Sequence, residues 1–288
     1  MSHSFGAFAS VCRSQFGTMV YEVKGKVFLV TGAANGIGAW FVKYVSEEDP
    51  KHVAILDVNE NLGVELQNEL NSKYGANKAK FYKCDVTDEE QLFSIYKSVV
   101  DSQGGLDVVV NNAGIMNDSL QTYKKEIAIN MTALVTSTLK GLELMRKDHG
   151  GRGGCIINIS SIAALHPSPI FPIYFATKSA VLQFGNCLSD DIYYSRTGVR
   201  IISMCFGVTD TALYANLGSF DQDVAQAIPE RVKAYPTQKV QTASRALVEA
   251  YKNGENGSIW LSTSEKPVKE ITDVVKKAYG MLTELVFN

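Results

Sequence analysis

The feature that most constrains the fold is a β-branched run leading directly into a glycine-rich turn. Residues 27–31 have the composition of a buried strand, and residues 31–38 (Thr-Gly-Ala-Ala-Asn-Gly-Ile-Gly) precede an apolar helical pattern. Glycines permit a tight turn, close approach of the backbone to a pyrophosphate and close packing of helix on strand. The helix N terminus adds free N–H groups and the positive end of a dipole. This position makes the turn a candidate dinucleotide site, although glycines also punctuate ordinary loops.

The same strand-then-helix pattern recurs along the chain. Strands alternating with helices of a dozen residues indicate βαβ units, and nearly continuous apolar strands indicate a sheet covered on both faces. With right-handed crossovers, this predicts an α/β fold: a doubly wound Rossmann-type domain with a seven-stranded parallel sheet. The expected strands are residues 27–31, 52–57, 79–84, 106–110, 155–160, 199–205 and 258–261, and the expected helices are residues 37–45, 59–73, 89–102, 123–147, 171–195 and 268–285.

Length and charge suit one soluble domain better than two. The chain has 288 residues, 45% of them hydrophobic, and a formal net charge of −2. Neither nucleic acid nor a membrane span is expected, because no basic cluster and no apolar run of spanning length is present. Residues 1–18 contain no acidic residue; we interpret them as a disordered extension before a domain over residues 19–288, with a mitochondrial transit segment as the alternative.

The cysteines indicate a reducing compartment, so we expect a cytoplasmic protein. They are dispersed and odd in number, and none has the spacing of a zinc site, so no metal is expected. These cysteines are Cys12, Cys84, Cys155, Cys187 and Cys205.

Two acidic residues end expected strands. Asp57 can accept hydrogen bonds from the adenosine ribose hydroxyls and would repel a 2′-phosphate, which favours NAD over NADP. Its alternative role is to cap the next helix. Asp85, followed by Val86, either faces the adenine or is a turn residue, and the sequence leaves both open.

A chemical centre is expected at the ends of later strands. Ser161 follows the fifth strand, and Tyr174 and Lys178 share one face of the next helix through their i, i+4 spacing. A lysine ammonium ~5 Å from a phenol favours phenolate by roughly 3 kcal/mol at an effective dielectric of ~20. Tyr174 can then act as general base or acid, and Ser161 can bind the substrate oxygen. Tyrosine–lysine pairs also occur on exposed helices, so the upstream serine is what makes this pair a candidate site.

With these motifs in order, the chain resembles the classical short-chain dehydrogenases/reductases over residues 24–261. The resemblance implies a catalytic set of Ser161, Tyr174, Lys178 and Asn130, with Asn130 holding a water that links the lysine to solvent. It further implies a homodimer or homotetramer built on the helices that carry Asn130 and Tyr174. The residues expected to bind NAD are Gly32, Asn35, Gly36, Ile37, Gly38, Asp57, Asp85, Val86, Asn112, Ala113, Gly114, Tyr174, Lys178, Gly207 and Thr211.

Within that family, the stretches Gly-Ala-Ala-Asn-Gly-Ile-Gly, Gly-Gly-Cys-Ile-Ile-Asn-Ile-Ser-Ser and Tyr-Phe-Ala-Thr-Lys are similar to the 15-hydroxyprostaglandin dehydrogenases and the related insect alcohol dehydrogenases. This similarity implies NAD-linked oxidation of a secondary alcohol. The expected substrate residues suggest an apolar pocket and a lipid, terpenoid, steroid or prostaglandin-like alcohol. They are His166, Phe171, Phe206, Tyr214 and Leu217.

One position departs from the family pattern. Phe206 precedes Gly207 where the family usually has proline, and proline would stiffen the loop. We therefore expect a looser loop and a ring directed toward the nicotinamide. This departure is the one feature that favours the rival function, a dinucleotide-binding protein without turnover. A Rossmann-like methyltransferase would leave Tyr174 and Lys178 without a role, and we set it aside.

Overall fold

Buried strands form one continuous sheet in a computed structural model that describes residues 20–287. The predicted extension over residues 1–18, including Cys12, lies outside the described residues. The strand order is β3-β2-β1-β4-β5-β6-β7-β8, and every adjacent pair except β7–β8 is parallel. The strands are β1 (Val27–Thr31), β2 (His52–Asp57), β3 (Ala79–Lys83), β4 (Val108–Asn111), β5 (Gly154–Ser161), β6 (Val199–Phe206), β7 (Ile259–Ser262) and β8 (Lys269–Glu270).

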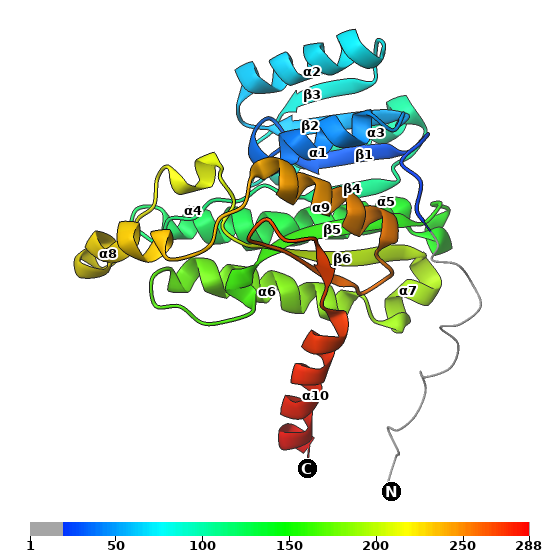
Figure 1. Cartoon of the computed structure of the whole chain (residues 1–288). Coiled ribbons are helices and arrows are strands. Elements are labelled where there is room, and N and C mark those ends of the chain that lie inside the picture. Colours follow the sequence, from blue (N-terminus) through cyan, green and yellow to red (C-terminus); the bar gives the residue numbers. More distant parts are fainter. Residues whose placement is uncertain (1–19, 288) are drawn as a thin grey trace, which may run out of the picture.

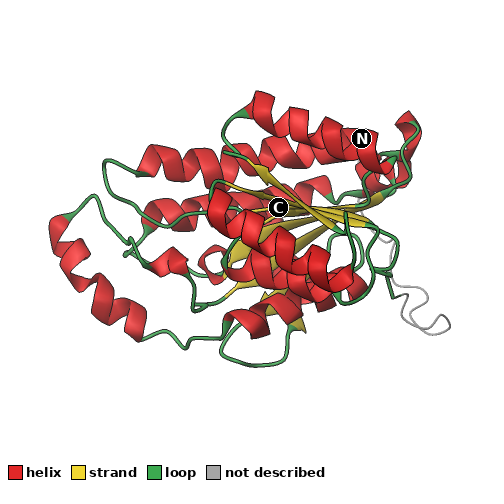
Figure 2. Cartoon of the chain, turned by 90° about the horizontal axis from the view of Figure 1, so that it is seen from above, coloured by secondary structure: helices red, strands yellow, loops and turns green. Residues whose placement is uncertain are grey.

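Helices cover both faces of this sheet, as Figures 1 and 2 show. The main helices are α1 (Gly36–Ser46), α2 (Glu60–Tyr74), α3 (Glu89–Gln103), α4 (Tyr123–Ile127), α5 (Leu134–Met145), α6 (Pro172–Leu188), α7 (Asp191–Thr197), α8 (Gln222–Lys233), α9 (Val240–Asn253) and α10 (Thr272–Phe287). Side chains alternate across β1: Phe28 packs with α1 and α9, whereas Leu29 packs with α3 and α5. This alternation is the two-sided burial expected of parallel strands, and the predicted fold class is confirmed.

The sheet has eight strands where seven parallel ones were predicted. The additional strand, β8, has two residues and pairs antiparallel with β7 through Trp260↔Glu270 and Leu261↔Lys269. A strand this short and exposed leaves little hydrophobic pattern in the sequence. Its residues lie at the start of the segment predicted as the last helix, which begins instead at Thr272.

Two long predicted helices are interrupted. The helix expected over residues 123–147 is α4, then a π-helical turn η1 (Ala128–Ala133), then α5. The helix expected over residues 171–195 ends at Leu188, and α7 begins anew with Asp190 accepting from the Ile192 N–H at 2.9 Å. Local capping by an aspartate competes with helix continuation. The sequence reading also missed α8 and α9 entirely.

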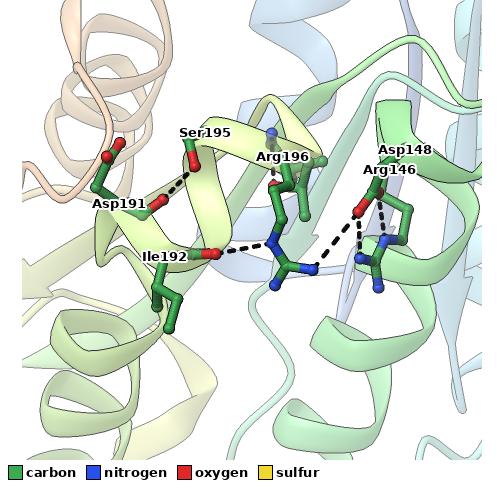
Figure 3. Close-up of polar contacts among 8 residues, drawn as sticks. Arg146, Asp148, Asp191, Ile192, Ser195 and Arg196 are labelled. Atoms are coloured by element: carbon green, nitrogen blue, oxygen red, sulfur yellow. Dashed lines mark hydrogen bonds and ion pairs between the residues drawn. The ribbon is translucent and has the colours of Figure 1, made fainter.

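A charged cluster joins the end of α5 to α7. Figure 3 shows Arg146 and Arg196 converging on Asp148. Arg146 donates to both carboxylate oxygens at 2.6 Å, and Arg196 lies 3.8 Å away. These bonds hold the pKa of Asp148 well below its ordinary value, at about 2. The cluster is structural, because it sits at the segment leading into β5, the opposite end from Ser161.

The last helix, α10, projects from the body of the molecule (Figure 1). Only Thr272 of this helix is buried. Its exposed apolar side chains are Val274, Tyr279, Met281, Leu282, Leu285, Val286 and Phe287. Within the described residues, no helix combines the length and hydropathy needed to cross a bilayer.

Candidate active site

A cleft of about 680 Å³ opens beyond the carboxyl ends of the strands. This is where doubly wound sheets bind ligands. The cleft brings together residues from distant parts of the sequence, and every predicted cofactor residue except Gly38 lines it. These are Gly32, Asn35, Gly36, Ile37, Asp57, Asp85, Val86, Asn112, Ala113, Gly114, Tyr174, Lys178, Gly207 and Thr211.

Gly38 lies beneath the glycine turn and makes close packing possible. A Cβ atom there would collide with the Gly32 carbonyl oxygen and lie 3.0 Å from the Ala33 Cα. Above it, Asn35 caps α1 by accepting from the Gly36 N–H at 2.7 Å. Gly36 has φ of +57°, a left-handed conformation that glycine adopts without strain. The turn therefore presents backbone close to the cleft, as a pyrophosphate requires.

Asp57 and Asp85 both line the cleft, and each accepts hydrogen bonds from nearby backbone N–H groups. Asp57 accepts from the Ala34 N–H at 3.0 Å and from the Asn59 N–H at 2.9 Å. The cap of α2 is Asn59, so the capping role considered for Asp57 belongs to its neighbour. Asp85 accepts from the Thr87 N–H at 3.0 Å and its hydroxyl at 2.7 Å, which lowers the pKa of the Asp85 carboxyl. Asp85 is thus a turn residue that also faces the cleft.

Asn112, the residue after β4, links the end of β4 to the end of β1. Asn112 donates its side-chain amide to the carbonyl oxygens of Thr31 and Gly32 at 3.0 and 2.8 Å. The Thr31 hydroxyl accepts from the Asn112 and Ala113 N–H groups, both at 3.1 Å. The floor of the cleft is therefore tied by hydrogen bonds between β1 and the segment after β4. Sequence reasoning did not select Thr31, since a threonine ending a strand is an unremarkable signal.

Ser161, Tyr174 and Lys178 converge at one end of the cleft, and all are buried. Ser161 ends β5, where its hydroxyl donates to the Phe206 carbonyl at 3.3 Å and accepts from the Ala163 N–H at 3.1 Å. Lys178 donates from Nζ to the Ile159 carbonyl at 3.0 Å. Its Nζ lies 5.7 Å from the centre of the Tyr174 ring.

Burial dominates the electrostatics of this group. It raises the pKa of the Tyr174 phenol above its ordinary value, and the nearby Tyr214 adds to the rise while a Ser161 hydrogen bond opposes it. Burial also lowers the pKa of Lys178 to about 8, opposed by Glu126. Removal of both groups from water disfavours both charges, so burial opposes the acidification of Tyr174 that the Lys178 ammonium was expected to produce.

Asn130 lies in the π-helical turn η1 and is fully buried. Its side-chain amide donates to the Ile115 carbonyl at 2.8 Å and its oxygen accepts from the Ile115 N–H at 2.9 Å. The side chain thus pins the loop after Gly114, and a Cβ on Gly114 would lie 3.3 Å from Asn130 Oδ1 and 3.6 Å from Lys178 Nζ. Besides these two backbone bonds, the Asn130 amide lies 3.4 Å from the Thr177 hydroxyl, on the helix that carries Lys178.

A small apolar pocket of about 50 Å³ adjoins the cleft at Ser161 and Tyr174. Of the predicted substrate residues, Phe171 and Tyr214 line this pocket, and Phe206 lines the cleft. His166 and Leu217 line neither. The His166 ring packs against Phe175 and Tyr235, at centroid distances of 5.6 and 6.1 Å.

Other pocket residues were missed by sequence reasoning. Val232 lies in α8 and Tyr235 just beyond it, and Met116 lies two residues after Gly114. Polar composition and an internal proline (Pro229) conceal α8. The available signal was Asp221, whose side chain caps the helix at the N–H groups of Asp223 and Val224.

Phe206, expected to loosen the loop after the sixth strand, belongs to the sheet itself. It is the last residue of β6, is buried in the core, and pairs with Ser161 and Ser262 in the sheet. Beyond it, Gly207 donates to the Ser262 carbonyl at 2.9 Å, and the Thr209 hydroxyl donates to the Gly207 carbonyl at 2.9 Å. These hydrogen bonds supply the order that a proline would otherwise impose.

Comparison with known proteins gives a consistent match. Residues 26–222 match the family model described as short chain dehydrogenase. The chain is 34% identical over 254 residues to human 15-hydroxyprostaglandin dehydrogenase [NAD(+)], covering 86% of this chain and 94% of that protein. It is 32% identical over 243 residues to alcohol dehydrogenase 1 of Ceratitis capitata, covering 84% and 93% of the two chains.

Among solved structures, the fold resembles a 3-ketoacyl-(acyl-carrier-protein) reductase from Brucella melitensis complexed with NADH. The TM-score is 0.70 at 20% identity, with 84% of this chain and 98% of that chain covered. At this identity the likeness concerns the fold.

Proposed function

Since this chain belongs to the short-chain dehydrogenase family, we propose that it is an NAD-dependent oxidoreductase that interconverts a secondary alcohol and a ketone. The observation that carries the proposal is the meeting of Ser161, Tyr174 and Lys178 at the junction between the large cleft and the small apolar pocket. A dinucleotide in the cleft and an alcohol in the pocket would then meet at these side chains.

The residues that line the cleft support the binding of a dinucleotide. The glycine turn and the N terminus of α1 suit the pyrophosphate, because Gly32, Gly36 and the tight packing at Gly38 bring backbone N–H groups to the surface. Asp57 would bind the adenosine ribose, and its charge disfavours a 2′-phosphate. Lys178 would hold the nicotinamide ribose, near Thr211. When bound, NAD supplies the acceptor for the hydride that leaves the alcohol carbon.

The protein's part in the reaction is to hold the alcohol oxygen and move its proton. Ser161 hydrogen-bonds the oxygen, and Tyr174 Oη takes the hydroxyl proton as hydride departs. Burial favours neutral Tyr174, so the phenol is well suited to donating the same proton in ketone reduction. Positive charge from Lys178 and from the oxidised cofactor favours the phenolate for oxidation.

The pocket favours an apolar alcohol. Its walls are mostly aliphatic or aromatic, and its polar side-chain groups are the hydroxyls of Ser161, Ser168 and the tyrosines. The main apolar lining residues are Met116, Ile170, Phe171, Phe175, Val232 and Tyr235. Burying an apolar group here gains about 25 cal/mol per Å². The substrate class we propose is therefore a lipid, terpenoid, steroid or prostaglandin-like secondary alcohol.

The proposal is tested by incubating the protein with NAD and a panel of secondary alcohols while following absorbance of the reduced nicotinamide. Turnover that Tyr174→Phe removes supports it. Tight NADH binding with no turnover on any alcohol or ketone would favour the rival, a dinucleotide-binding protein with a storage or regulatory role.

A homodimer or homotetramer is also part of the proposal. We propose the exposed apolar face of α10 as its interface, in place of the helices that carry Asn130 and Tyr174, because an unburied face of this kind is unusual on a monomer. Sedimentation of the wild type and of Leu282→Glu tests this assembly. A smaller particle is expected for the variant, and monomeric wild type at micromolar concentration would refute it.

For location, we propose the cytoplasm, with mitochondria as the alternative. The described cysteines Cys84, Cys155, Cys187 and Cys205 are all free, as in a reducing compartment. Imaging of the full chain carrying a C-terminal fluorescent tag distinguishes the two compartments.

A further inference from the structure

Two buried carboxyl groups lie behind Tyr174, and the proton transfer proposed above uses neither. Asp118 belongs to the loop between β4 and α4, and Glu126 belongs to α4; both are 0% exposed. Each carboxyl group influences the pKa of the other, as expected of side chains that lie close together. Buried charges are costly unless paired or neutralised, so two carboxyl groups in contact require a physical account.

The hydrogen bonds of the pair are almost complete. Asp118 accepts from the N–H groups of Ile173 at 2.7 Å and Tyr174 at 3.1 Å, in the first turn of α6. Glu126 Oε1 accepts from the Asn117 N–H at 3.2 Å. Glu126 Oε2 is buried and has no partner among the residues that the structure describes. A proton on Oε2 would make it the donor that the pair lacks.

We propose that Asp118 and Glu126 share one proton and together position Tyr174. In this arrangement Asp118 is the ionised member, because it accepts two helix N–H groups and faces the positive end of the α6 dipole. Glu126 is the protonated member and donates to Asp118. The pair acts on the site through the backbone of Tyr174 and through the negative charge that the two carboxyl groups share, so both are positioning residues.

The same loop connects Tyr174 to the segment that follows Thr211. The Asp118 N–H donates to the Gly218 carbonyl at 3.0 Å, and the Asn117 amide donates to the Asn216 carbonyl at 2.7 Å. Asn216 lines the cofactor cleft. Asp118 therefore joins the start of the catalytic helix to one wall of the cleft.

The surrounding charges agree with a shared proton. Burial, with the charge of Asp118, raises the pKa of Glu126 to about 8, and Lys178 opposes the rise. The titratable groups facing Glu126 are Asp118 from its loop and Lys178 and Tyr174 from α6. An ionised Glu126 would raise the pKa of Tyr174 further and hinder proton removal from the alcohol. When Glu126 is protonated, the pair carries a single negative charge, on Asp118.

The sign of the stability effect follows from linkage. The folded protein holds the Glu126 proton more tightly than the unfolded chain, whose glutamate pKa is about 4.3. Stability from this group is therefore full below that value and is lost as pH rises through about 8. Glutamine at this position keeps a donor and cannot ionise.

Infrared spectroscopy and urea unfolding of the full chain test the shared proton without any need for turnover. Wild type, Glu126→Gln and the exposed control Glu143→Gln are compared, since Glu143 pairs with Lys140 on the surface of α5. We expect the C=O stretch of a protonated carboxyl group in wild type and control, lost with a midpoint near pH 8, and absent in Glu126→Gln. Wild-type stability should fall relative to Glu126→Gln across this range. No such band in wild type at about pH 6, or parallel stability curves for wild type and Glu126→Gln, would overturn the shared proton.

Kinetics test the positioning role, which rests on the proposed function. Asparagine at 118 has one acceptor oxygen for two helix N–H groups, so Asp118→Asn should lower kcat about tenfold or more while NADH affinity stays within about twofold. Glu126→Gln should extend oxidation activity to higher pH than wild type does. Equal kcat in Asp118→Asn and Glu143→Gln overturns the positioning role. If the protein turns over none of the substrates, the proposed function is refuted. The infrared result then decides by itself whether Asp118 and Glu126 share a proton.

Discussion

Lys178 Nζ lies 5.7 Å from the centre of the Tyr174 ring and is anchored 3.0 Å from the Ile159 carbonyl oxygen. The two side chains leave successive turns of α6 and enter the same buried corner, next to Ser161. The ammonium group is held by the end of β5, so its position relative to the phenol is set by the packing of helix on sheet. The predictions that follow test what this arrangement and the cleft around it do.

Removing the Tyr174 hydroxyl should abolish chemistry and spare binding. Tyr174→Phe should lower kcat by about 100- to 10,000-fold, the usual contribution of a general acid or base. NADH affinity, measured by fluorescence titration, should change little. Tyr279→Phe on the projecting helix α10 is the matched control and should behave as wild type. Residual activity above about a tenth of wild type would remove Tyr174 from the proton-transfer role.

Lys178→Met should lower activity and raise the free energy of unfolding, and the size of the rise should depend on pH. Burial lowers the folded-state pKa of Lys178 to about 8, below the value near 10.4 in an unfolded chain. The buried charge therefore costs stability below about pH 8, and the cost disappears as pH rises toward 10.4. Urea unfolding should show a higher free energy of unfolding for the variant than for wild type at neutral pH. This difference should shrink as the pH rises toward about 10.4. A constant difference across this range contradicts the buried ammonium.

Asp57→Ser should relax the preference for NAD. Serine removes the charge that repels a 2′-phosphate, so the affinity ratio of NADPH to NADH should rise about tenfold, equivalent to about 1.4 kcal/mol. Competition titration with the two reduced cofactors measures it. Glu60→Gln is the control, because Glu60 pairs with Lys83 nearby and does not line the cleft. An unchanged ratio in Asp57→Ser would place the ribose elsewhere.

Gly38→Ala should destabilise the nucleotide end specifically. Its Cβ would collide with the Gly32 carbonyl oxygen, which is backbone and cannot move aside cheaply. Overpacking of this kind costs about 1–3 kcal/mol, and NADH binding should weaken with it. Gly280→Ala on α10 has nothing within 4 Å of its Cβ and should instead gain about 0.5–1 kcal/mol of helix stability. Equal unfolding midpoints for the two variants would contradict the packing account.

Much of the architecture could be predicted from local patterns. The β-branched run at residues 27–31 and the turn after it require only neighbouring residues to form, and the structure places β1 and α1 there. Likewise, the spacing of Tyr174 and Lys178 on a helix and the position of Ser161 at a strand end are properties of short segments. Where the hydrophobic pattern was strong and periodic, the predicted bounds of helices and strands agreed with the structure within a few residues.

Competing local interactions explain the elements that were wrong or missed. Asp190 and Asp221 each cap the N terminus of a helix, and a single capping residue is a weaker sequence signal than a long apolar pattern. The turn η1 interrupts a helix where Asn130 directs its amide to Ile115, a contact with a different segment. A contact between distant segments leaves no periodic hydrophobic pattern in the sequence.

By itself, the sequence determined which segments become strands and helices, their order, and the motifs that end at one edge of the sheet, because these depend on backbone preferences and side-chain alternation over short distances. Only the tertiary structure decided the electrostatics of the site and the partners of its buried polar groups. Burial sets the pKa values of Tyr174 and Lys178, and Asp118 meets both Glu126 and the start of α6. The desolvation and hydrogen bonding of a group depend on segments that are distant in the chain and adjacent only after folding.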